Sequence, residues 1–229
     1  DSDAVSRLAL RLIAANARVN AAALIVALGL IVVPVYPTLP ADQVEFILRD
    51  SGARVAFAST SAQLEKLLVI RTRLASLERV LVFDKVAALE GIPSLDALLE
   101  GIDESISSWG RQLRKRAYGV SAESIATIIY TSGTTGTPKG AVLTHDNIAS
   151  MLAATRQHGS LKTWPGMVGL SLLPLSHVLE RAAAYYYWDS GVTIAYAESV
   201  AAVPANTSWK KNFAARGTPV QLREVKTPW

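Results

Sequence analysis

One short stretch of this chain concentrates the residue types that bind phosphate. Residues 131–140 read TSGTTGTPKG, so ten residues contain three glycines, four threonines, one serine and one lysine. Glycines let the backbone turn tightly and bring its N–H groups close to an anion. Hydroxyl groups donate to phosphate oxygens or give a lone pair to a metal ion, and a lysine adds a compact positive charge. The stretch therefore predicts a polyphosphate site; the alternative is a polar turn that binds nothing.

The stretch differs from the two glycine-rich loops with well-known sequence patterns. The Walker pattern requires Gly-Lys followed by Ser or Thr, whereas Lys139 lies between Pro138 and Gly140. The glycine spacing also departs from the dinucleotide-binding fingerprint. The loop therefore indicates the class of ligand without indicating either of those folds.

Strand and helix signals alternate along the chain around this loop. Runs rich in β-branched residues predict strands, and apolar residues at helical spacing predict helices. The predicted strands are residues 31–35, 54–58, 80–83 and 125–130, and the predicted helices are one capped by Ser2, then 21–28, 40–51, 62–74, one capped by Ser94, and 176–188. This alternation predicts an α/β fold with a mostly parallel sheet and helices on both faces. The loop follows the strand 125–130, and open parallel sheets bind ligands at the carboxyl ends of their strands.

Composition excludes several classes of protein. Of 229 residues, half are hydrophobic and 18% are charged, which argues against a disordered chain. The absence of cysteine excludes disulfides, thiolate zinc sites and cysteine nucleophiles. The apolar residues 21–35 are fewer than the ~20 that a spanning helix needs, and Asp1 and Asp3 do not suit a signal peptide. We expect a cytoplasmic protein, with peripheral contact at the inner face of a membrane left open.

The positive charge of the chain is confined to its last residues. The net charge is +4, and residues 205–229 contain five basic residues against one acidic residue, so residues 1–204 are neutral. A neutral body carries no basic stripe of the kind that binds nucleic acid, and we expect no nucleic-acid partner. The predicted organisation is a folded part over residues 1–204 followed by a basic tail over residues 205–229.

Three stretches resemble one known family. YTSGTTGTPKG at residues 130–140 resembles the phosphate-binding signature of the AMP-forming acyl-CoA synthetases, in the adenylate-forming superfamily. Residues 141–145 resemble the strand and turn that follow this signature in the family, and residues 32–57 resemble its N-terminal region. LPLSHVLER at residues 173–181 resembles a second motif in the form typical of long-chain fatty acid members. The resemblance covers residues 30–200 and implies a truncated N-terminal part of the adenylate-forming fold.

The resemblance implies a reaction and a set of site residues. In such enzymes a fatty acid carboxylate attacks the α-phosphate of ATP, acyl-adenylate and pyrophosphate form, and CoA displaces AMP; ATP, Mg²⁺ and CoA are the implied cofactors. Lys139 and His177 match catalytic positions, and Thr134 matches the hydroxyl near Mg²⁺. The residues that match the binding loop for the β- and γ-phosphates are Thr131, Ser132, Gly133, Thr134, Thr135, Gly136, Thr137 and Lys139.

Several of these residues also have a purely structural interpretation. His177 matches a position beside the acyl carboxylate, and the motif around it favours that role; the alternative is a helix-end histidine bonded to the backbone. Glu180 and Arg181 could form ion pairs with other parts of the site or with each other. The aromatic run 185–188 cannot share one helix face, so we expect most of it to pack in the core. Thr144 is a plausible N-cap for the helix that follows it, and none of the histidines has neighbours at the spacing of a transition-metal site.

The chain also departs from the family pattern. The adenine-binding motif, the acidic residue that completes the Mg²⁺ site, the ribose-binding aspartate and the C-terminal lysine have no counterpart here. We therefore expect a fragment or a decayed gene product that is inactive alone, and a non-catalytic nucleotide- or pyrophosphate-binding fragment is the alternative function. Amino-acid, aryl-acid and fatty-acid activating members share the loop, so only residues 173–181 favour a long acyl chain. A truncated sheet leaves an unpaired edge, so we expect self-association or marginal stability.

Overall fold

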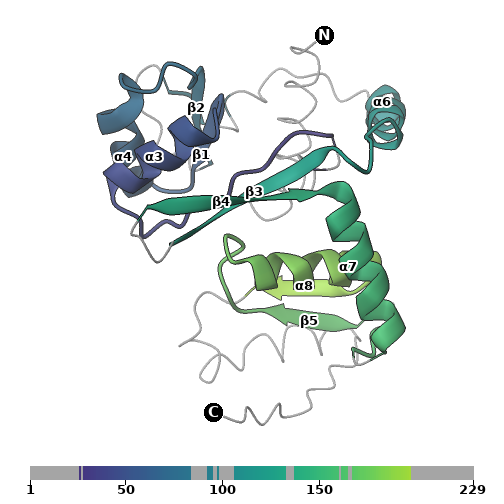
Figure 1. Ribbon diagram of the computed structural model, residues 1–229. Helices are drawn as coiled ribbons and strands as arrows, with labels where there is room; N and C mark the ends of the chain where they lie inside the picture. The colour runs from purple at the N-terminus through teal and green to yellow at the C-terminus, as the bar shows by residue number, and fades with distance from the viewer. Residues whose placement is uncertain are drawn as a thin grey trace, which may run out of the picture. The chain divides into compact units, whose positions relative to one another are not determined.

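The computed structural model describes residues 26, 28–83, 92–94, 97, 106–132, 137–159, 161–164 and 167–196 (Figure 1). The chain forms two compact units, Asp1–Asn147 and Ile148–Trp229. The elements in chain order are α3 (Ala41–Asp50), β1 (Val55–Ala58), α4 (Ser61–Arg71), β2 (Arg79–Val82), α6 (Ile106–Tyr118), β3 (Ile125–Ser132), β4 (Pro138–Thr144), α7 (His145–His158), β5 (Val168–Ser171), α8 (Val178–Asp189) and β6 (Thr193–Tyr196).

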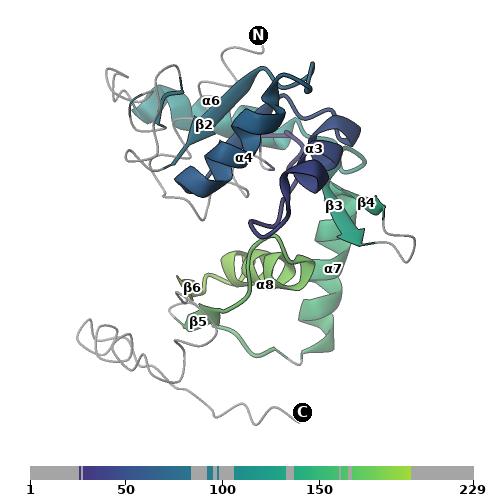
Figure 2. The same ribbon diagram turned by 90° about the vertical axis from the view of Figure 1, so that its left-hand side faces the viewer.

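The main core of the first unit lies among α3, α4, β1 and β2, which gather together in Figures 1 and 2. Strands β1 and β2 pair in parallel, with Val55 opposite Arg79, and α4 connects them, because parallel neighbours need a crossover. The Thr60 hydroxyl caps α4 by accepting from the Gln63 N–H. The apolar side chains that fill this core come from all four elements and include Val44, Leu48, Leu64, Leu67, Ile70, Val80 and Val82.

The predicted elements of this region are confirmed with small changes at their ends. Helix α4 ends at Arg71 rather than at residue 74, because the chain continues in turns closed by the Arg73 and Leu74 N–H groups. Leu74 nevertheless stays buried in the core. The predicted strand 31–35 forms one isolated parallel bridge, from Val32 to Thr127. Ser94 accepts from the Ala97 N–H, as a cap would. The helix capped by Ser2, most of residues 21–28 and the tail 205–229 lie outside the described residues, as does the predicted boundary at residue 204.

The loop-bearing strands form a hairpin. Strand β3 pairs antiparallel with β4, with Tyr130 opposite Gly140, Thr131 opposite Lys139 and Ser132 opposite Pro138. The predicted phosphate loop therefore joins two antiparallel strands, and β4 confirms the strand that the resemblance implies after the loop. The physical reason is length, because a connection of a few residues can only join antiparallel neighbours. Gly140 is required at this position: an added Cβ would lie 2.9 Å from Ile128 and 3.1 Å from the Tyr130 ring.

The second unit contains a small strand–helix–strand unit. Strands β5 and β6 pair in parallel from Val168 opposite Thr193 to Ser171 opposite Tyr196, with α8 between them in the chain. Arg156 of α7 forms an ion pair with Asp189 at the end of α8. The α/β fold class is confirmed. In the part of the chain that the structure describes, the strands form three two-stranded sheets, two parallel and one antiparallel.

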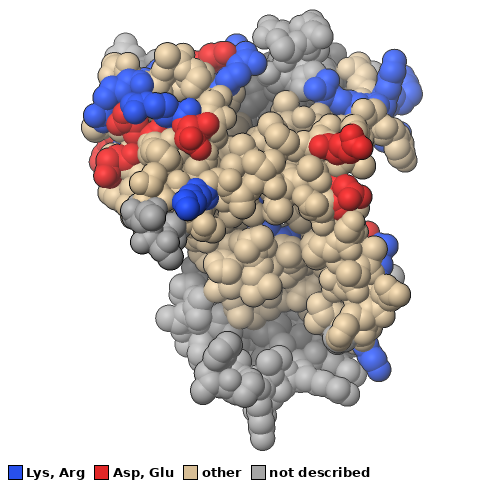
Figure 3. All heavy atoms as spheres, viewed as in Figure 1, with Lys and Arg blue, Asp and Glu red and all other residues tan. Residues whose placement is uncertain are grey.

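Charged side chains of both signs share the surface of the first unit. Figure 3 shows Lys and Arg interspersed with Asp and Glu over α3 and α4. Specific pairs account for part of this mixture: Glu45 is bound by Arg49 and, at 2.9 Å, by Arg73, and Arg54 binds Glu78 at 2.6 Å. Bonding to Arg54 holds the pKa of Glu78 below its ordinary value. Among the described helices, none combines the length and the apolar composition needed to cross a membrane.

Candidate functional site

The end of the β3–β4 hairpin presents a hydroxyl and an ammonium group on one face. Thr131 and Lys139 are directly opposite each other, and opposed residues of an antiparallel pair point to the same side. Both residues are exposed, as is Thr137 within the same stretch 131–140. Gly133, Thr134, Thr135 and Gly136 lie outside the described residues, as does the side chain of Ser132. The structure thus brings Thr131, Thr137 and Lys139 together where the sequence predicts a phosphate.

The opposite face of the same hairpin is anchored. Side chains alternate along a strand, so Tyr130 points away from the face that carries Thr131. Tyr130 is 7% exposed, and its hydroxyl donates to Asp50 at 2.5 Å. Burial raises the pKa of the Tyr130 phenol well above its ordinary value, and the Asp50 carboxylate raises it further. At the end of the hairpin, Tyr130 is therefore packed against α3, whereas Thr131 and Lys139 are exposed.

The turn after the hairpin is held by a reciprocal cap. The Thr144 hydroxyl accepts from the Asn147 N–H at 3.2 Å, and the Asn147 side chain accepts from the Thr144 N–H at 3.0 Å. This confirms the predicted N-cap. The His145 N–H donates to the Ser124 carbonyl at 3.0 Å, which ties the helix start to the residues before β3. The buried Nε2 atom of His145 has no hydrogen-bond partner within the described part of the chain.

His177 is the N-cap of α8. Its Nδ1 atom accepts from the Leu179 N–H at 3.3 Å. A ring nitrogen that accepts carries no proton, so this contact selects the neutral ring with the proton on Nε2. The structural interpretation of His177 as a helix-end residue bonded to the backbone is therefore confirmed. The catalytic role stays a prediction, and His177 belongs to the second unit whereas Lys139 belongs to the first.

The two charged residues after His177 are buried. Glu180 is 8% exposed and accepts from the Leu173 N–H at 3.2 Å, which ties the segment before His177 to the first turn of α8. Arg181 is 4% exposed; it donates to the Tyr185 hydroxyl at 2.9 Å, and its charge lies 5.8 Å from the centre of that ring. Both charged side chains therefore form hydrogen bonds within the segment around His177. Sequence reasoning noted these residues, but only the structure shows these partners.

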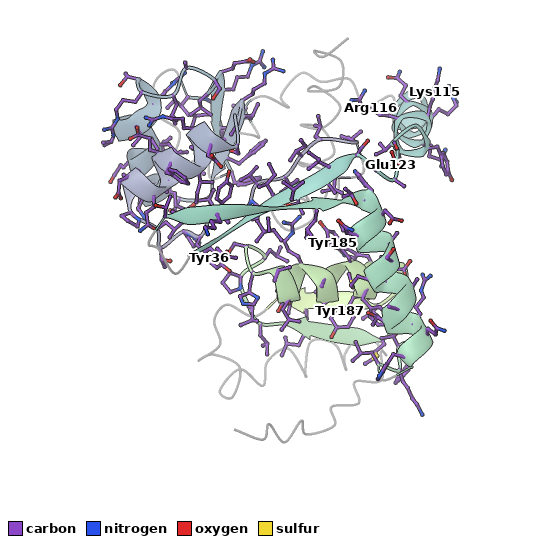
Figure 4. The ribbon with its side chains drawn as sticks, viewed as in Figure 1. Tyr36, Lys115, Arg116, Glu123, Tyr185 and Tyr187 are labelled. Carbon is purple, nitrogen blue, oxygen red and sulfur yellow. The ribbon has the colours of Figure 1, made fainter. Side chains whose placement is uncertain are left out.

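The aromatic run of α8 packs within its unit. The Tyr186 hydroxyl donates to the Leu161 carbonyl at 2.9 Å, and the Tyr187 ring lies against Gly169, where an added Cβ would approach it to 2.8 Å. Figure 4 shows Tyr185 and Tyr187 on this helix. Burial, and then the nearby Glu180 charge, raise the pKa of Tyr187. The prediction of core packing is thus confirmed for Tyr186, which is 5% exposed, whereas Tyr185, Tyr187 and Trp188 are half-buried.

A concave region beside α6 has a structural explanation. The cavity measures about 600 Å³ and its lining includes Lys115, Arg116 and Ser121. Lys115 and Arg116 lie in the last turn of α6 (Figure 4), where positive charge complements the free carbonyl groups of a helix end. The Arg116 Nε also donates to the Leu28 carbonyl at 2.8 Å. These contacts account for both cations without a ligand.

The described residues do not form a metal site by themselves. Over the described residues, no three His, Asp or Glu side chains gather in a way that could hold a metal ion. The hydroxyl of Thr134, implied for Mg²⁺, lies outside those residues. A single hydroxyl does not make a magnesium site, which takes oxygen ligands in near-octahedral geometry. Most ligands of a bound Mg²⁺ would have to come from the phosphates, from water or from other residues.

The cap at His177 gives a direct stability prediction. Replacing His177 by alanine removes the acceptor for the Leu179 N–H and should lower the free energy of unfolding by about 1 kcal/mol. His177→Asn keeps a capping side chain and should retain most of this stability. Urea denaturation followed by far-UV circular dichroism measures both variants. Equal losses in the two variants would contradict the capping role.

Comparison with known proteins identifies the family to which this chain belongs. The model of the AMP-binding enzyme family matches residues 18–218. The long-chain-fatty-acid–CoA ligase FadD15 of Mycobacterium bovis is 34% identical over 176 residues, which cover 77% of this chain and 28% of that protein. The peroxisomal long chain acyl-CoA synthetase 6 of Arabidopsis thaliana is 33% identical over 165 residues, covering 72% of this chain and 23% of that protein. The chain thus spans about a quarter of the length of these relatives.

Solved structures share the fold. A red-emitting luciferase of Phrixothrix hirtus superimposes with a TM-score of 0.65 at 19% identity, over 84% of this chain and 39% of that one. The N-terminal domain of FACL13 from Mycobacterium tuberculosis gives 0.61 at 22% identity, over 93% and 52% of the two chains. At such identities the likeness shows the fold alone. The family match, which includes both the glycine-threonine hairpin and the His177 helix, shows that this chain belongs to the AMP-binding enzymes.

Proposed function

We propose that this chain supplies the phosphate-binding loop of an AMP-forming ligase that activates a long-chain fatty acid and transfers it to CoA. The observation that carries the proposal is the exposed Thr131 and Lys139 pair at the end of a hairpin that the buried Tyr130 anchors to α3. A cation and hydroxyl donors on a fixed backbone suit a polyphosphate. The family match and the names of the relatives support the reaction class.

The loop acts on the leaving group. The carboxylate of the substrate attacks the α-phosphorus of ATP, the bond from that phosphorus to the bridging oxygen breaks, and the electron pair leaves with pyrophosphate. Lys139 and the hydroxyls of Thr131 and Thr137 bind the phosphates and stabilise this growing negative charge. Donors that are already in place lose little free energy to reorganisation as the charge develops. No protein nucleophile is needed, since the substrate carboxylate is one.

His177 orients the acyl carboxylate in this proposal. Because Nδ1 is bonded to the helix backbone, Nε2–H is the group that can donate to a carboxylate oxygen. The hydrogen bond from Leu173 to Glu180 holds the segment before His177 and thereby the position of the ring. A long acyl chain is the favoured substrate, since residues 173–181 have the long-chain form of the motif and the relatives are named long-chain ligases.

Two measurements together test the function. Calorimetry of the 229-residue chain with ATP and Mg²⁺ tests for the phosphate site, and ATP–pyrophosphate exchange with a long-chain fatty acid tests for adenylate formation. We expect binding without exchange by this chain alone, and exchange by a protein that continues it with the missing motifs. Binding with no exchange in both would instead support the non-catalytic nucleotide-binding fragment, and a chain that binds no nucleotide would refute both functions.

Self-association is a further part of the proposal. Helix α7 has no buried residue, and Val142 on β4 is 51% exposed. Such apolar surface favours contact with a second copy. Sedimentation velocity over a range of concentrations should show species larger than the monomer at the higher concentrations. A monomer at every concentration, with a sharp and concentration-independent melt, would contradict this expectation.

A further inference from the structure

The residue before the phosphate loop is fixed to a distant helix. Tyr130 precedes Thr131, and its hydroxyl donates to the Asp50 carboxylate at the end of α3, at 2.5 Å. Its ring also packs edge-on against Phe46 of the same helix, with ring centres 6.5 Å apart and planes at 89°. On the other strand, Gly140 leaves room for this ring, since an added Cβ would lie 3.1 Å from it. Three neighbouring features thus hold one tyrosine in one place.

Asp50 occupies a position that does not favour the helix. It is the last residue of α3, where the free carbonyl groups give the helix end a partial negative charge. A carboxylate there is repelled, whereas Arg49 in the same turn suits the helix end. Asp50 is exposed and makes its hydrogen bond with a tyrosine that is 80 positions away in the chain. Helix stability therefore gives no reason for an aspartate here, while the bond to Tyr130 does.

We propose that Asp50 and Tyr130 form a positioning pair that holds the phosphate loop in its binding geometry, an inference whose effect on ligand binding rests on the proposed function. Neither side chain touches the ligand, because Tyr130 points to the face opposite that of Thr131 and Lys139. The pair acts through the backbone of the hairpin. It fixes the first strand to α3 immediately before the loop and so limits the movement of Thr131 and Lys139.

The test compares two buried tyrosines that each lose the hydrogen bonding of their hydroxyl. Tyr130→Phe removes the hydroxyl that binds Asp50. Tyr186→Phe is the control, since Tyr186 is also buried, at 5% exposure, but belongs to the second unit, where its hydroxyl donates to the Leu161 carbonyl and accepts from the Thr163 hydroxyl. Asp50→Ala removes the acceptor, whereas Asp50→Asn keeps an oxygen that can accept. The readouts are hydrogen exchange of residues 125–144 in the free chain and the affinity for inorganic pyrophosphate measured by calorimetry.

We expect Tyr130→Phe and Asp50→Ala each to accelerate exchange across the hairpin and to weaken pyrophosphate binding about tenfold, the scale of one lost hydrogen bond to a charged group. The double variant should be no worse than either single variant, because the two residues act as one pair. Asp50→Asn should recover part of the affinity. Tyr186→Phe should leave both hairpin exchange and affinity unchanged, even if it lowers the unfolding midpoint as much.

Different results would contradict the proposed function and the positioning pair. Wild-type protein that binds no pyrophosphate would overturn the proposed function, and hydrogen exchange in the free chain would still decide whether the pair holds the hairpin. Unchanged exchange in Tyr130→Phe would overturn the positioning pair. So would equal losses in Tyr130→Phe and Tyr186→Phe, since these would show a general loss of stability. Fully additive effects of the two positions would also overturn it.

Discussion

Replacing Lys139 by alanine is expected to weaken the binding of ATP with Mg²⁺, and of pyrophosphate, by about 10- to 100-fold. Hydrogen bonds that involve a charged group are worth about 1.5–3 kcal/mol, and each 1.4 kcal/mol is about tenfold in affinity. Lys139 is the one cation in the stretch 131–140, and it is exposed directly opposite Thr131. Its removal therefore takes away the positive charge of the loop without removing any packing. Calorimetry on the 229-residue chain measures the change.

The matched control removes the same charge elsewhere in the same unit. Lys115 is exposed in the last turn of α6, so Lys115→Ala changes the net charge equally while leaving the hairpin intact. Lys115→Ala should bind phosphates within about twofold of wild type, because exposed charges more than a Debye length of ~10 Å apart are largely screened at 0.1 M salt. Lys139→Arg should retain a large part of the affinity. Equal losses in Lys139→Ala and Lys115→Ala would show that general attraction, rather than this loop, binds the anion.

Ile70→Ala should be among the most destabilising single changes in the first unit. Ile70 is 0% exposed and lies on α4 in the core formed with α3, β1 and β2. Shortening a buried isoleucine to alanine removes its apolar contacts and leaves a cavity, at a cost of about 2–5 kcal/mol. The adjacent Val69 is 67% exposed, so Val69→Ala should change stability by no more than about 0.5 kcal/mol. Urea unfolding of both variants measures the difference.

The Ile70→Ala variant also tests whether packing of this core supports the candidate phosphate site. Helix α3 contributes Val44 and Leu48 to this core and also carries Asp50, which binds Tyr130 of the loop-bearing hairpin. Loss of core packing by Ile70→Ala should therefore loosen the support of the phosphate loop as well as the core. Hydrogen exchange of residues 125–144 would then rise in Ile70→Ala and stay at the wild-type rate in Val69→Ala. Similar stability of the two variants would contradict the burial of Ile70.

The parts of the fold that depend on local pattern could be predicted from the sequence. Helix α3, helix α4 and strand β3 lie within a few residues of their predicted limits, because apolar spacing and capping residues are features of neighbouring positions. The Thr144 cap is confirmed for the same reason. The strand predicted at residues 31–35 is reduced to a single bridge at Val32. None of residues 31–35 is buried, and Ile31 is 47% exposed, so the buried strand expected from this apolar run is wrong; the composition of a run does not fix its partner strand.

The features of the candidate site likewise divide into those that local sequence determines and those that depend on packing between elements. By itself the sequence determined the ligand class and the family resemblance, because glycines, hydroxyls and one lysine in ten consecutive residues already define which groups can contact a phosphate. Only the tertiary structure decided that the loop ends an antiparallel hairpin, that Asp50 supports it through Tyr130, and that Glu180 holds the segment before His177. Strand direction and such contacts depend on how separate elements pack together, and packing joins residues that no local pattern relates.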